Sequence, residues 1–278
     1  SACLVGSEMC IRDSNEAVKY IDEDVIIFLN NDAVFLDSDS FSTIKKTFES
    51  NEMISIAQPR ILDYNNQDKY EYAGASGGYL DFLGYPFCRG RILGNIEKSD
   101  KYNTTREIFW ASGSCFIIRK SIFKLLNGFD EDFFCHMEEI DLCWRLKNLD
   151  SSYKIITIGK TNVYHVGGGT MQYGGNRKNY LNFRNSLVML IKNLPKKYFI
   201  FSLFLRLICD LFILIFSVLL FRFGLSFSIL SAYYFNILNF RKSLSKRKKG
   251  LGSYKYFICF SILINYYFFG KKTFSSIK

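Results

Sequence analysis

Short apolar runs alternate with amphipathic stretches over the first two thirds of the chain, which predicts an α/β domain. Residues 24–29 read DVIIFL, a continuous run rich in β-branched side chains that is typical of a central parallel strand covered on both faces. A helix at residues 41–49 and a strand at residues 54–61 follow, so these three elements predict a βαβ unit. Residues 63–108 are polar and rich in Tyr and Gly, and they predict an elaborated loop or hairpin region.

The next stretch continues the same alternation. Residues 138–149 predict an amphipathic helix, because apolar side chains recur three, four and seven positions after Glu139. The other predicted elements are strands at residues 113–119, 154–158 and 161–165, a short helix at residues 121–126 and a longer helix at residues 176–193.

The hydrophobic pattern changes after residue 197. Residues 198–221 are apolar except for Arg206 and Asp210, which are four apart and can pair, and residues 223–240 and 256–270 carry no charge. These are membrane-type segments. The uninterrupted apolar core of the first is shorter than the ~20 residues of a spanning helix, so both spanning and interfacial helices fit.

Charge divides the chain in the same way. The net charge is +10, but residues 151–278 hold 20 Lys+Arg and one acid, Asp210, while residues 1–150 hold 16 Lys+Arg and 25 Asp+Glu. An acidic front disfavours a nucleic-acid partner. A basic and apolar back suits an anionic membrane surface, to which each nearby Lys or Arg adds about 1 kcal/mol, and the basic cluster at residues 241–249 is expected to stay cytosolic.

Cysteine usage and the first residues bear on compartment and boundaries. The eight cysteines form no Cys-x-x-Cys pair, which indicates neither a zinc site nor a disulfide scaffold and favours a reducing cytosol. Residues 1–14 lack the pattern of a signal peptide and resemble translated adapter sequence, so we interpret them as a non-native or artefactual leader. We therefore predict a partial catalytic domain over residues 15–197 and a basic, apolar, membrane-associating region over residues 198–278.

Polar side chains follow the first predicted strand. Asn30, Asn31 and Asp32 come directly after it, at the strand end where ligands bind in open α/β sheets. The short carboxylate of Asp32 can hold a divalent cation, and Asn30 can hydrogen-bond a phosphate or a ribose. A simple turn after the strand is the alternative interpretation.

A second motif is more distinctive. The sequence GFDEDFF at residues 128–134, followed by HMEEIDLCWR at residues 136–145, resembles the family 2 glycosyltransferases of bacterial envelope polysaccharide assembly, especially their rhamnosyltransferase-like branch. The resemblance covers most of residues 15–197. Its other matches are LNNDA at residues 29–33, ASGSC at residues 111–115 and VYHVGGG at residues 163–169.

The resemblance implies a glycosyltransferase A-type fold and inverting transfer of a sugar from a nucleoside-diphosphate donor to a hydroxyl of a lipid-linked or polysaccharide acceptor. It places Glu139 at the position of the catalytic base, with Glu138 and Asp141 as lesser candidates. A carboxylate that only stabilises the helix dipole is the alternative for Glu139. The implied location is the cytoplasmic face of the bacterial inner membrane.

The resemblance also implies a metal site. His165 matches the histidine that completes this site with Asp32, and imidazole with carboxylate suits Mn²⁺, while Mg²⁺ prefers oxygen alone. A packed or surface histidine is the alternative. Asn30, Asn31 and Asp32 are assigned to donor binding, and the acceptor-side or supporting residues are Trp110, Gly113, Ser114, Glu138, Asp141 and Arg145, with His136 in a structural or acceptor-side role.

Two departures from the family pattern matter. Asn30 replaces the first acid of the Asp-x-Asp motif, which leaves one protein carboxylate for the metal. Family members begin with nucleobase-binding strands upstream of the first strand here, so we expect a sheet without them, weak nucleotide binding and no measurable transfer by this chain alone. The alternatives are a non-catalytic membrane-bound protein and a sugar nucleotidyltransferase, which needs a Gly-rich phosphate loop that the front of the chain does not show.

Overall fold

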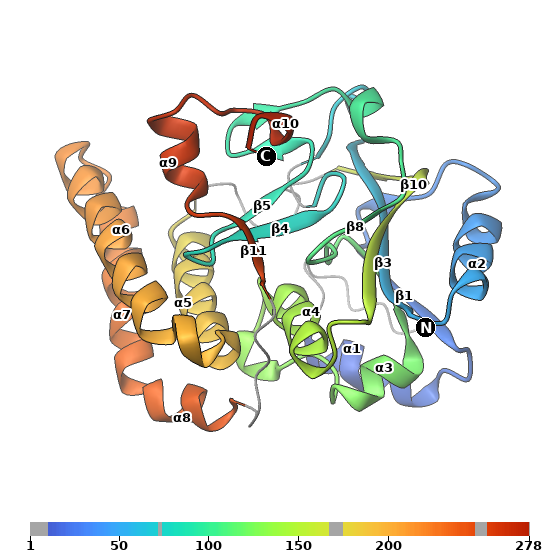
Figure 1. Ribbon diagram of the computed structural model, residues 1–278, viewed down its shortest axis with the longest axis horizontal. Coiled ribbons are helices and arrows are strands. Elements are labelled where there is room, and N and C mark those ends of the chain that lie inside the picture. Colours follow the sequence, from blue (N-terminus) through green and yellow to red (C-terminus); the bar gives the residue numbers. More distant parts are fainter. Residues whose placement is uncertain (1–10, 72–73, 167–174, 248–254, 278) are drawn as a thin grey trace.

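The computed structural model describes residues 11–71, 74–166, 175–247 and 255–277 (Figure 1). Its centre is a six-stranded sheet with the order β1-β9-β3-β10-β2, in which β8 also pairs with β10. The strands are β1 Val25–Leu29, β2 Ala33–Val34, β3 Ile54–Asp63, β8 Arg106–Glu107, β9 Cys115–Arg119 and β10 Lys154–His165. Most of the predicted leader, residues 1–10, and residues 167–169 of the predicted motif lie outside the described residues.

The position of β1 differs from the expectation. Within the described residues β1 pairs only with β9, and this pairing is antiparallel, so the prediction of a central parallel strand is wrong. β9 lies between β1 and β3 and is antiparallel to both, so β1 and β3 run in the same direction without touching. The parallel pair is β3 with β10. The two strands predicted at residues 154–158 and 161–165 form one strand, β10, whose register shifts between Ile158 and Asn162.

Helices cover both faces of this sheet. They are α1 Ile11–Ala17, α2 Ser40–Ser50, α3 Lys120–Leu125 and α4 Glu138–Leu149. A further helix, α5 Asn176–Asn193, contacts α4 and α7, and α4 and α5 have the predicted bounds. Side chains of β9 alternate between the faces, because successive residues of a strand point in opposite directions. Ile117 packs with Ile44 of α2, whereas Phe116 and Ile118 join the larger core that includes α4.

A second sheet of five strands, β11-β4-β5-β6-β7, confirms the predicted hairpin region. Its strands are β4 Gly78–Asp81, β5 Pro86–Cys88, β6 Arg91–Ile92, β7 Asn95–Ile96 and β11 Phe257–Cys259. β11 comes from the last apolar segment and pairs parallel with β4. The expectation of a membrane-type segment at residues 256–270 is therefore wrong, since this stretch holds β11 and the short helix α9, Ile262–Tyr267.

The remaining apolar segments are helical, as predicted. The helices are α6 Phe199–Leu219, α7 Phe223–Leu238, α8 Phe240–Ser245 and α10 Phe274–Ile277. α6 and α7 form a hairpin that lies beside α5 at the left of Figure 1, with Ser217 and Ser226 in hydrogen-bond contact at 2.7 Å. By length and composition, the helical stretch Lys196–Leu219 is long and apolar enough to cross a membrane.

Candidate functional site

The residues predicted to bind a metal meet at one end of the six-stranded sheet. β2 pairs antiparallel with the end of β10, so Ala33 lies opposite His165, and the Val166 N–H donates to the carbonyl of Asp32 at 3.0 Å. This pairing brings Asp32 Oδ1 to 3.0 Å from His165 Nε2. The polar triplet is also a turn, because the Ala33 N–H donates to the carbonyl of Asn30 at 3.1 Å. The turn interpretation and the site prediction therefore describe the same backbone.

A third residue, the acid Glu71, completes this cluster. Its Oε2 lies 3.4 Å from His165 Nδ1, and the Glu71 and His165 side chains are only 4% and 7% exposed. Asn30 Nδ2 lies 3.4 Å from His165 Nε2. Burial lowers the pKa of His165, but hydrogen bonding and charge from Glu71, with the charge of Asp32, raise it more, so the net pKa lies above its ordinary value. The imidazole is thus held between two carboxylates.

Sequence analysis did not identify Glu71. It lies in the polar, Tyr-rich region after β3, and no motif or spacing distinguishes it from the other acids there. Its place next to His165 depends on contacts distant in sequence. The end of β3 pairs with the end of β10, with Asp63 opposite His165, and the Glu71 N–H donates to the carbonyl of Ile61 on β3 at 3.1 Å.

Asp32 and His165 fit a divalent cation in their spacing. Two neighbouring ligands of an octahedral ion, each about 2.1 Å from it, lie about 3.0 Å apart, which is the separation of Asp32 Oδ1 and His165 Nε2. A metal-bound histidine usually has a carboxylate or carbonyl at its other ring nitrogen, which fixes its tautomer, and Glu71 is placed for that role. Within the described ranges no group of three or more His, Cys, Asp or Glu side chains could hold a metal by itself.

Glu139 lies in the first turn of α4, after a strained loop. Backbone φ is positive at three non-glycine residues of this loop: 65° at Phe134, 67° at His136 and 72° at Met137. Each such residue costs about 1–3 kcal/mol and persists only when its surroundings hold it. The buried side chain of Asn185 on α5 holds this loop, since its Nδ2 donates to the carbonyls of Phe133, Cys135 and His136 at 3.0, 2.7 and 2.8 Å.

Sequence analysis did not identify Asn185 either. Within residues 176–193 it is one of several polar residues of a predicted helix, and only the fold shows that it faces the loop. Its side chain is fully buried. Asn185 is therefore a positioning residue for the start of α4, where Glu138 is buried and Glu139 is half-buried.

Glu139 and Glu71 lie near the same thiol, that of Cys88 at the end of β5. Burial raises the pKa of Cys88 to about 12, a backbone hydrogen bond with Gly74 and the charge of Arg91 oppose this rise, and the charges of Glu71 and Glu139 add to it. Both carboxylates are thus close enough to Cys88 to act on it.

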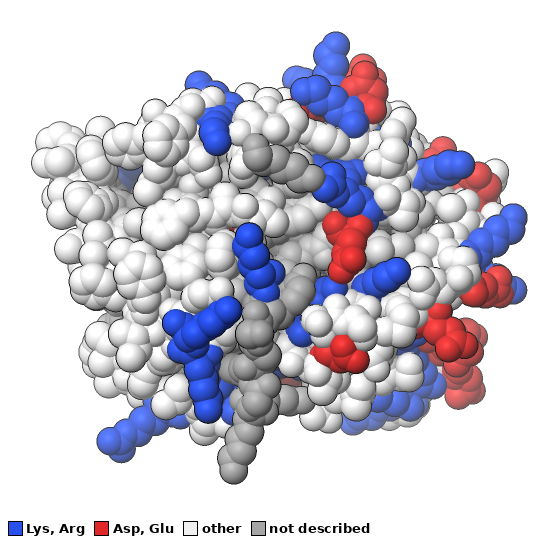
Figure 2. All heavy atoms as spheres, in the orientation of Figure 1, with Lys and Arg blue, Asp and Glu red and all other residues white. Residues whose placement is uncertain are grey.

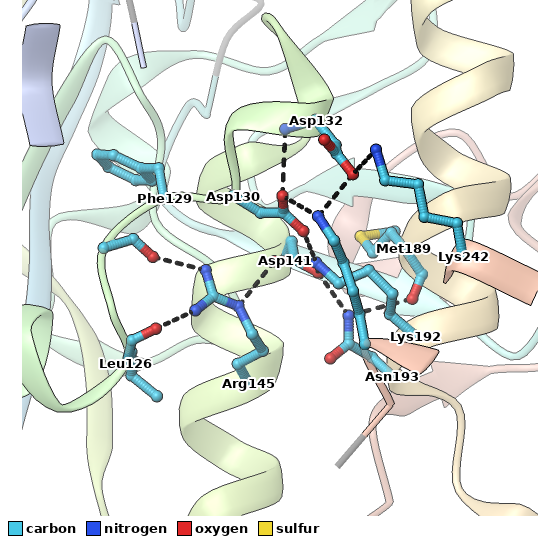
Figure 3. Close-up of polar contacts among 12 residues, drawn as sticks. Leu126, Phe129, Asp130, Asp132, Asp141, Arg145, Met189, Lys192, Asn193 and Lys242 are labelled. Carbon is cyan, nitrogen blue, oxygen red and sulfur yellow. Dashed lines mark hydrogen bonds and ion pairs between the residues drawn. The ribbon is translucent and has the colours of Figure 1, made fainter. Parts of the chain in front are cut away.

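Asp141 anchors α4 to α5 through buried polar contacts (Figure 3). Its fully buried carboxylate accepts from Arg145 Nε and from Asn193 Nδ2, each at 2.7 Å, and pairs with Lys192 Nζ at 2.8 Å. Burial raises the pKa of Asp141, but Lys192 and Arg145 lower it more, and the net pKa lies below its ordinary value. A carboxylate so occupied is unsuited to accept a proton from a substrate.

Arg145 and Asp130 hold the loop that precedes α4. Arg145 donates to the carbonyls of Leu126 and Gly128 at 2.6 and 2.8 Å. Asp130 pairs with Lys192 and Lys246, each at 2.6 Å, and Lys242 pairs with Asp132 at 2.8 Å (Figure 3). Several charged residues of the motif at residues 128–145 therefore fix the loop and the helix in place.

The other predicted supporting residues lie around the Asn30 turn and the second sheet. The carbonyl of Ser114 accepts from the Asn30 N–H at 3.1 Å, which ties the turn to the segment before β9. Trp110 is buried, and its Nε1 donates to the carbonyl of Tyr79 at 3.0 Å. A Cβ at Gly78 would lie 1.9 Å from the Trp110 ring, so only glycine fits there. Gly113 is half-buried and Asn31 is exposed.

Comparison with known proteins gives the family. Residues 10–200 match the family described as Glycosyltransferase like family 2. This chain belongs to that family. The match covers the six-stranded sheet, the Asp32–His165–Glu71 cluster and α4, so the rhamnosyltransferase-like resemblance seen in the motifs is confirmed.

Two curated relatives are named rhamnosyltransferases. Rhamnosyltransferase WbbL of Escherichia coli K12 is 28% identical over 142 residues, which are 49% of this chain and 53% of the relative. N-acetylglucosaminyl-diphospho-decaprenol L-rhamnosyltransferase of Mycobacterium tuberculosis is 49% identical over 41 residues, 15% of this chain and 13% of the relative. The chain thus matches about half the length of the first relative and less of the second.

A solved structure, that of GalNAc-T7 with UDP, GalNAc and Mn²⁺, aligns with 66% of this chain and 34% of its own chain. The TM-score is 0.45 and the sequence identity is 13%.

Proposed function

We propose that this family 2 chain takes part in inverting transfer of a sugar from a nucleoside-diphosphate donor to a hydroxyl of a lipid-linked or polysaccharide acceptor. The observation that carries the proposal is the His165 imidazole between Asp32 and Glu71, at the sheet end where Asn30 also lies. The names of the two relatives support rhamnose as the sugar and, for the mycobacterial one, a polyprenol-linked acceptor.

Asp32 and His165 would bind the metal of the donor complex. A divalent cation, Mn²⁺ or Mg²⁺, neutralises charge that develops on a departing diphosphate. Asp32 would supply a carboxylate oxygen and His165 would supply Nε2, while Glu71 would accept a hydrogen bond from Nδ1–H and so leave the Nε2 lone pair for the metal. Donor oxygens and water would fill the remaining positions, and the Asn30 amide can donate to a phosphate or ribose oxygen.

Glu139 is the proposed base. Its carboxylate takes the proton from the acceptor hydroxyl, whose oxygen attacks the anomeric carbon from the face opposite the diphosphate. The bond between the anomeric carbon and the phosphate oxygen breaks, its electron pair leaves with the diphosphate, and the configuration inverts. The strained loop held by Asn185 fixes the start of α4, which keeps the carboxylate in place before the acceptor arrives.

The test separates donor binding from proton removal. Thermal unfolding of the wild-type chain is followed with uridine or thymidine diphosphate, with and without Mn²⁺, because a ligand that binds only the folded state raises Tm. We expect a Mn²⁺-dependent rise in the wild type and in Glu139→Gln, and no such rise in Asp32→Asn. An equal rise in Asp32→Asn would overturn the metal assignment.

Turnover tests the base. Where release of nucleoside diphosphate in the presence of acceptor is measurable, Glu139→Gln should slow it about 10²–10⁴-fold, the usual contribution of general base catalysis. Glu138→Gln is the matched control, because Glu138 is the preceding acid of the same helical turn and is buried.

We also infer a place of action at the cytoplasmic face of the bacterial inner membrane. Both named relatives are bacterial. A lipid-linked acceptor has to be met at a bilayer surface, and α6 presents a long apolar face with exposed basic residues at both its ends.

A further inference from the structure

The α6–α7 hairpin has a polar inner face. The buried residues of α6 are Ser202, Arg206, Asp210 and Ser217, which recur at multiples of about one helical turn. Ser202 Oγ donates to the carbonyl of Phe82 at 2.8 Å. All four are polar or charged, so the side of this apolar helix that packs on the rest of the chain is its polar side.

Arg206 and Asp210 lie at the centre of this inner face. The Arg206 guanidinium lies 3.8 Å from the centre of the Tyr85 ring and donates to Asp210 at 2.9 Å, to Ser186 Oγ on α5 at 2.9 Å and to the carbonyl of Leu83 at 3.2 Å. Asp210 also accepts from the hydroxyls of Tyr85 and of Tyr233 on α7. The middle of α6 is therefore fixed to α5, to α7 and to the loop between β4 and β5.

The outer face of the hairpin is apolar and exposed. We define the apolar face by three residues on each helix, each between 58% and 81% exposed: Ile200, Phe204 and Phe212 on α6, and Phe223, Phe227 and Ile237 on α7. Figure 2 shows the side of the molecule formed by this hairpin, at the left, almost entirely without charged side chains. A patch of this size is unusual on a protein that meets only water.

We propose that the α6–α7 hairpin lies in the plane of an anionic membrane surface, with the apolar face at the boundary of the acyl chains, and does not cross the bilayer. At 1.5 Å per residue the 21 residues of α6 are about 30 Å long, which is enough to span. A spanning α6 would carry the β4–β5 loop into the hydrocarbon, because Leu83 and Tyr85 contact Arg206 at the middle of the helix. Irregular backbone facing lipid does not occur at that depth.

Separating α6 from the domain would not permit a span either. It would leave Arg206 and Asp210 without Leu83, Tyr85 and Ser186, and a charged pair in hydrocarbon is costly. Lying sideways in the interface keeps all these contacts and still buries the apolar face. The hairpin then acts as a monotopic anchor.

Basic residues at the ends of α6 and α7 favour an anionic membrane surface as the partner. Lys196 and Lys197 precede α6, Arg222 lies in the turn between the helices and Arg241 follows α7, and all four are exposed. Asp210 is the one acid of residues 151–278 and it is buried, so no acidic side chain of this part of the sequence offsets the positive charge of these four residues. Anionic headgroups beside an apolar acyl boundary match this arrangement, since each basic residue there adds about 1 kcal/mol.

Flotation with vesicles tests the surface without any sugar donor, so its result is independent of sugar transfer. The whole chain is mixed with vesicles of phosphatidylcholine and phosphatidylglycerol, or of phosphatidylcholine alone. We expect the wild-type chain to bind the anionic vesicles. The double variant Phe212→Asp with Phe227→Asp should bind them at least about tenfold more weakly, because two apolar rings are lost from the acyl-chain boundary. Phe41→Asp is the matched control, since Phe41 is equally exposed on α2, away from the hairpin.

Unchanged binding of the double variant, or equal binding to both vesicle types, would overturn the proposed surface. Circular dichroism of each variant shows whether the fold is kept. If the double variant does not fold, Ile200→Ser with Ile237→Ser tests the same face with smaller changes.

Labelling decides between lying in the interface and spanning. Arg222→Cys places a thiol at the turn of the hairpin and Arg241→Cys places one after α7. A membrane-impermeant maleimide is added outside vesicles that carry bound protein, with the wild-type chain as background for its own cysteines. We expect both new thiols to react. Protection of the Arg222→Cys thiol until detergent is added, with Arg241→Cys reactive, would show that the hairpin crosses the bilayer.

Discussion

At the scale of single residues, Glu71 offers the sharpest test of the site. Its carboxylate lies 3.4 Å from His165 Nδ1, on the side of the ring opposite Asp32. We expect Glu71→Gln to weaken Mn²⁺ binding in the presence of a nucleoside diphosphate about 10–100-fold, the usual effect of removing the carboxylate behind a metal-bound histidine. Isothermal titration measures this affinity directly and needs no turnover.

The control for this substitution is Glu97→Gln. Glu97 is as buried as Glu71, but its carboxylate accepts from Lys101, from the Tyr102 hydroxyl and from the Phe274 N–H. Its replacement should leave Mn²⁺ affinity unchanged. An affinity equally reduced in both variants would mean that a general loss of stability, and not the orientation of His165, is responsible.

At the scale of elements, Asp141 makes α4 depend on α5. Asp141→Asn should cost about 3–5 kcal/mol of folding free energy, because it leaves the buried Lys192 and the Arg145 guanidinium without their shared carboxylate. Urea unfolding measures the loss. Asp150→Asn is the control, since Asp150 is exposed and its carboxylate accepts from the N–H and the hydroxyl of Ser152.

The same carboxylate gives a dependence on pH. The pKa of Asp141 in the folded state is below its ordinary value. The Asp141 carboxylate therefore contributes fully to the free energy of unfolding above its pKa in the unfolded state, about 4, and this contribution is lost as the pH falls through the folded-state pKa. The difference in unfolding free energy between wild type and Asp141→Asn should therefore be constant between about pH 8 and pH 6. It should become smaller below about pH 4, the ordinary pKa of an aspartate. A gap that widens in acid would show that the pKa is not depressed.

Local periodicity accounts for what the sequence could predict at this scale. α4 has the predicted bounds because its apolar positions repeat with the helical period, and α5 ends as predicted shortly before Pro195, which disfavours a helical conformation in the residue that precedes it. The strand order could not be derived in this way, since the insertion of β9 between β1 and β3 is a contact over about 90 residues of sequence. β11 was missed because three apolar residues fit a strand and a membrane segment equally.

The same contrast between local pattern and contacts distant in sequence applies to the site residues. Asp32, Glu139 and His165 belong to recognisable motifs, so their types and positions were accessible from the sequence. Glu71 and Asn185 carry no motif, and their roles depend on which side chains the fold brings to them. An acidic residue in a motif can also serve to stabilise the fold, as the buried pair of Asp141 with Lys192 illustrates.

At the scale of the whole molecule, α5 connects the apolar hairpin to the loop before Glu139. Two consecutive residues of α5 face these two parts: Ser186 accepts from Arg206 of α6, and Asn185 donates to the carbonyls of the loop at residues 133–136. α7 also lies against α5, where Asn236 Nδ2 donates to the carbonyl of Arg184 at 3.1 Å. The hairpin proposed to face the membrane and the proposed base are therefore placed by one helix.

Where turnover is measurable, we expect Asn185→Ala to lower kcat, because the strained loop loses the donor that holds three of its carbonyls. The donor KM and the Mn²⁺-dependent rise in Tm should stay close to wild type, since Asp32 and His165 are untouched. Steady-state kinetics measures the split. Asn236→Ala is the matched control, a buried asparagine on the same helix interface that does not touch the loop. Loss of buried hydrogen bonds should destabilise both variants by about 1–3 kcal/mol, so a fall in kcat confined to Asn185→Ala reports on the position of Glu139, and an equal fall in both would reduce Asn185 to a stabilising residue.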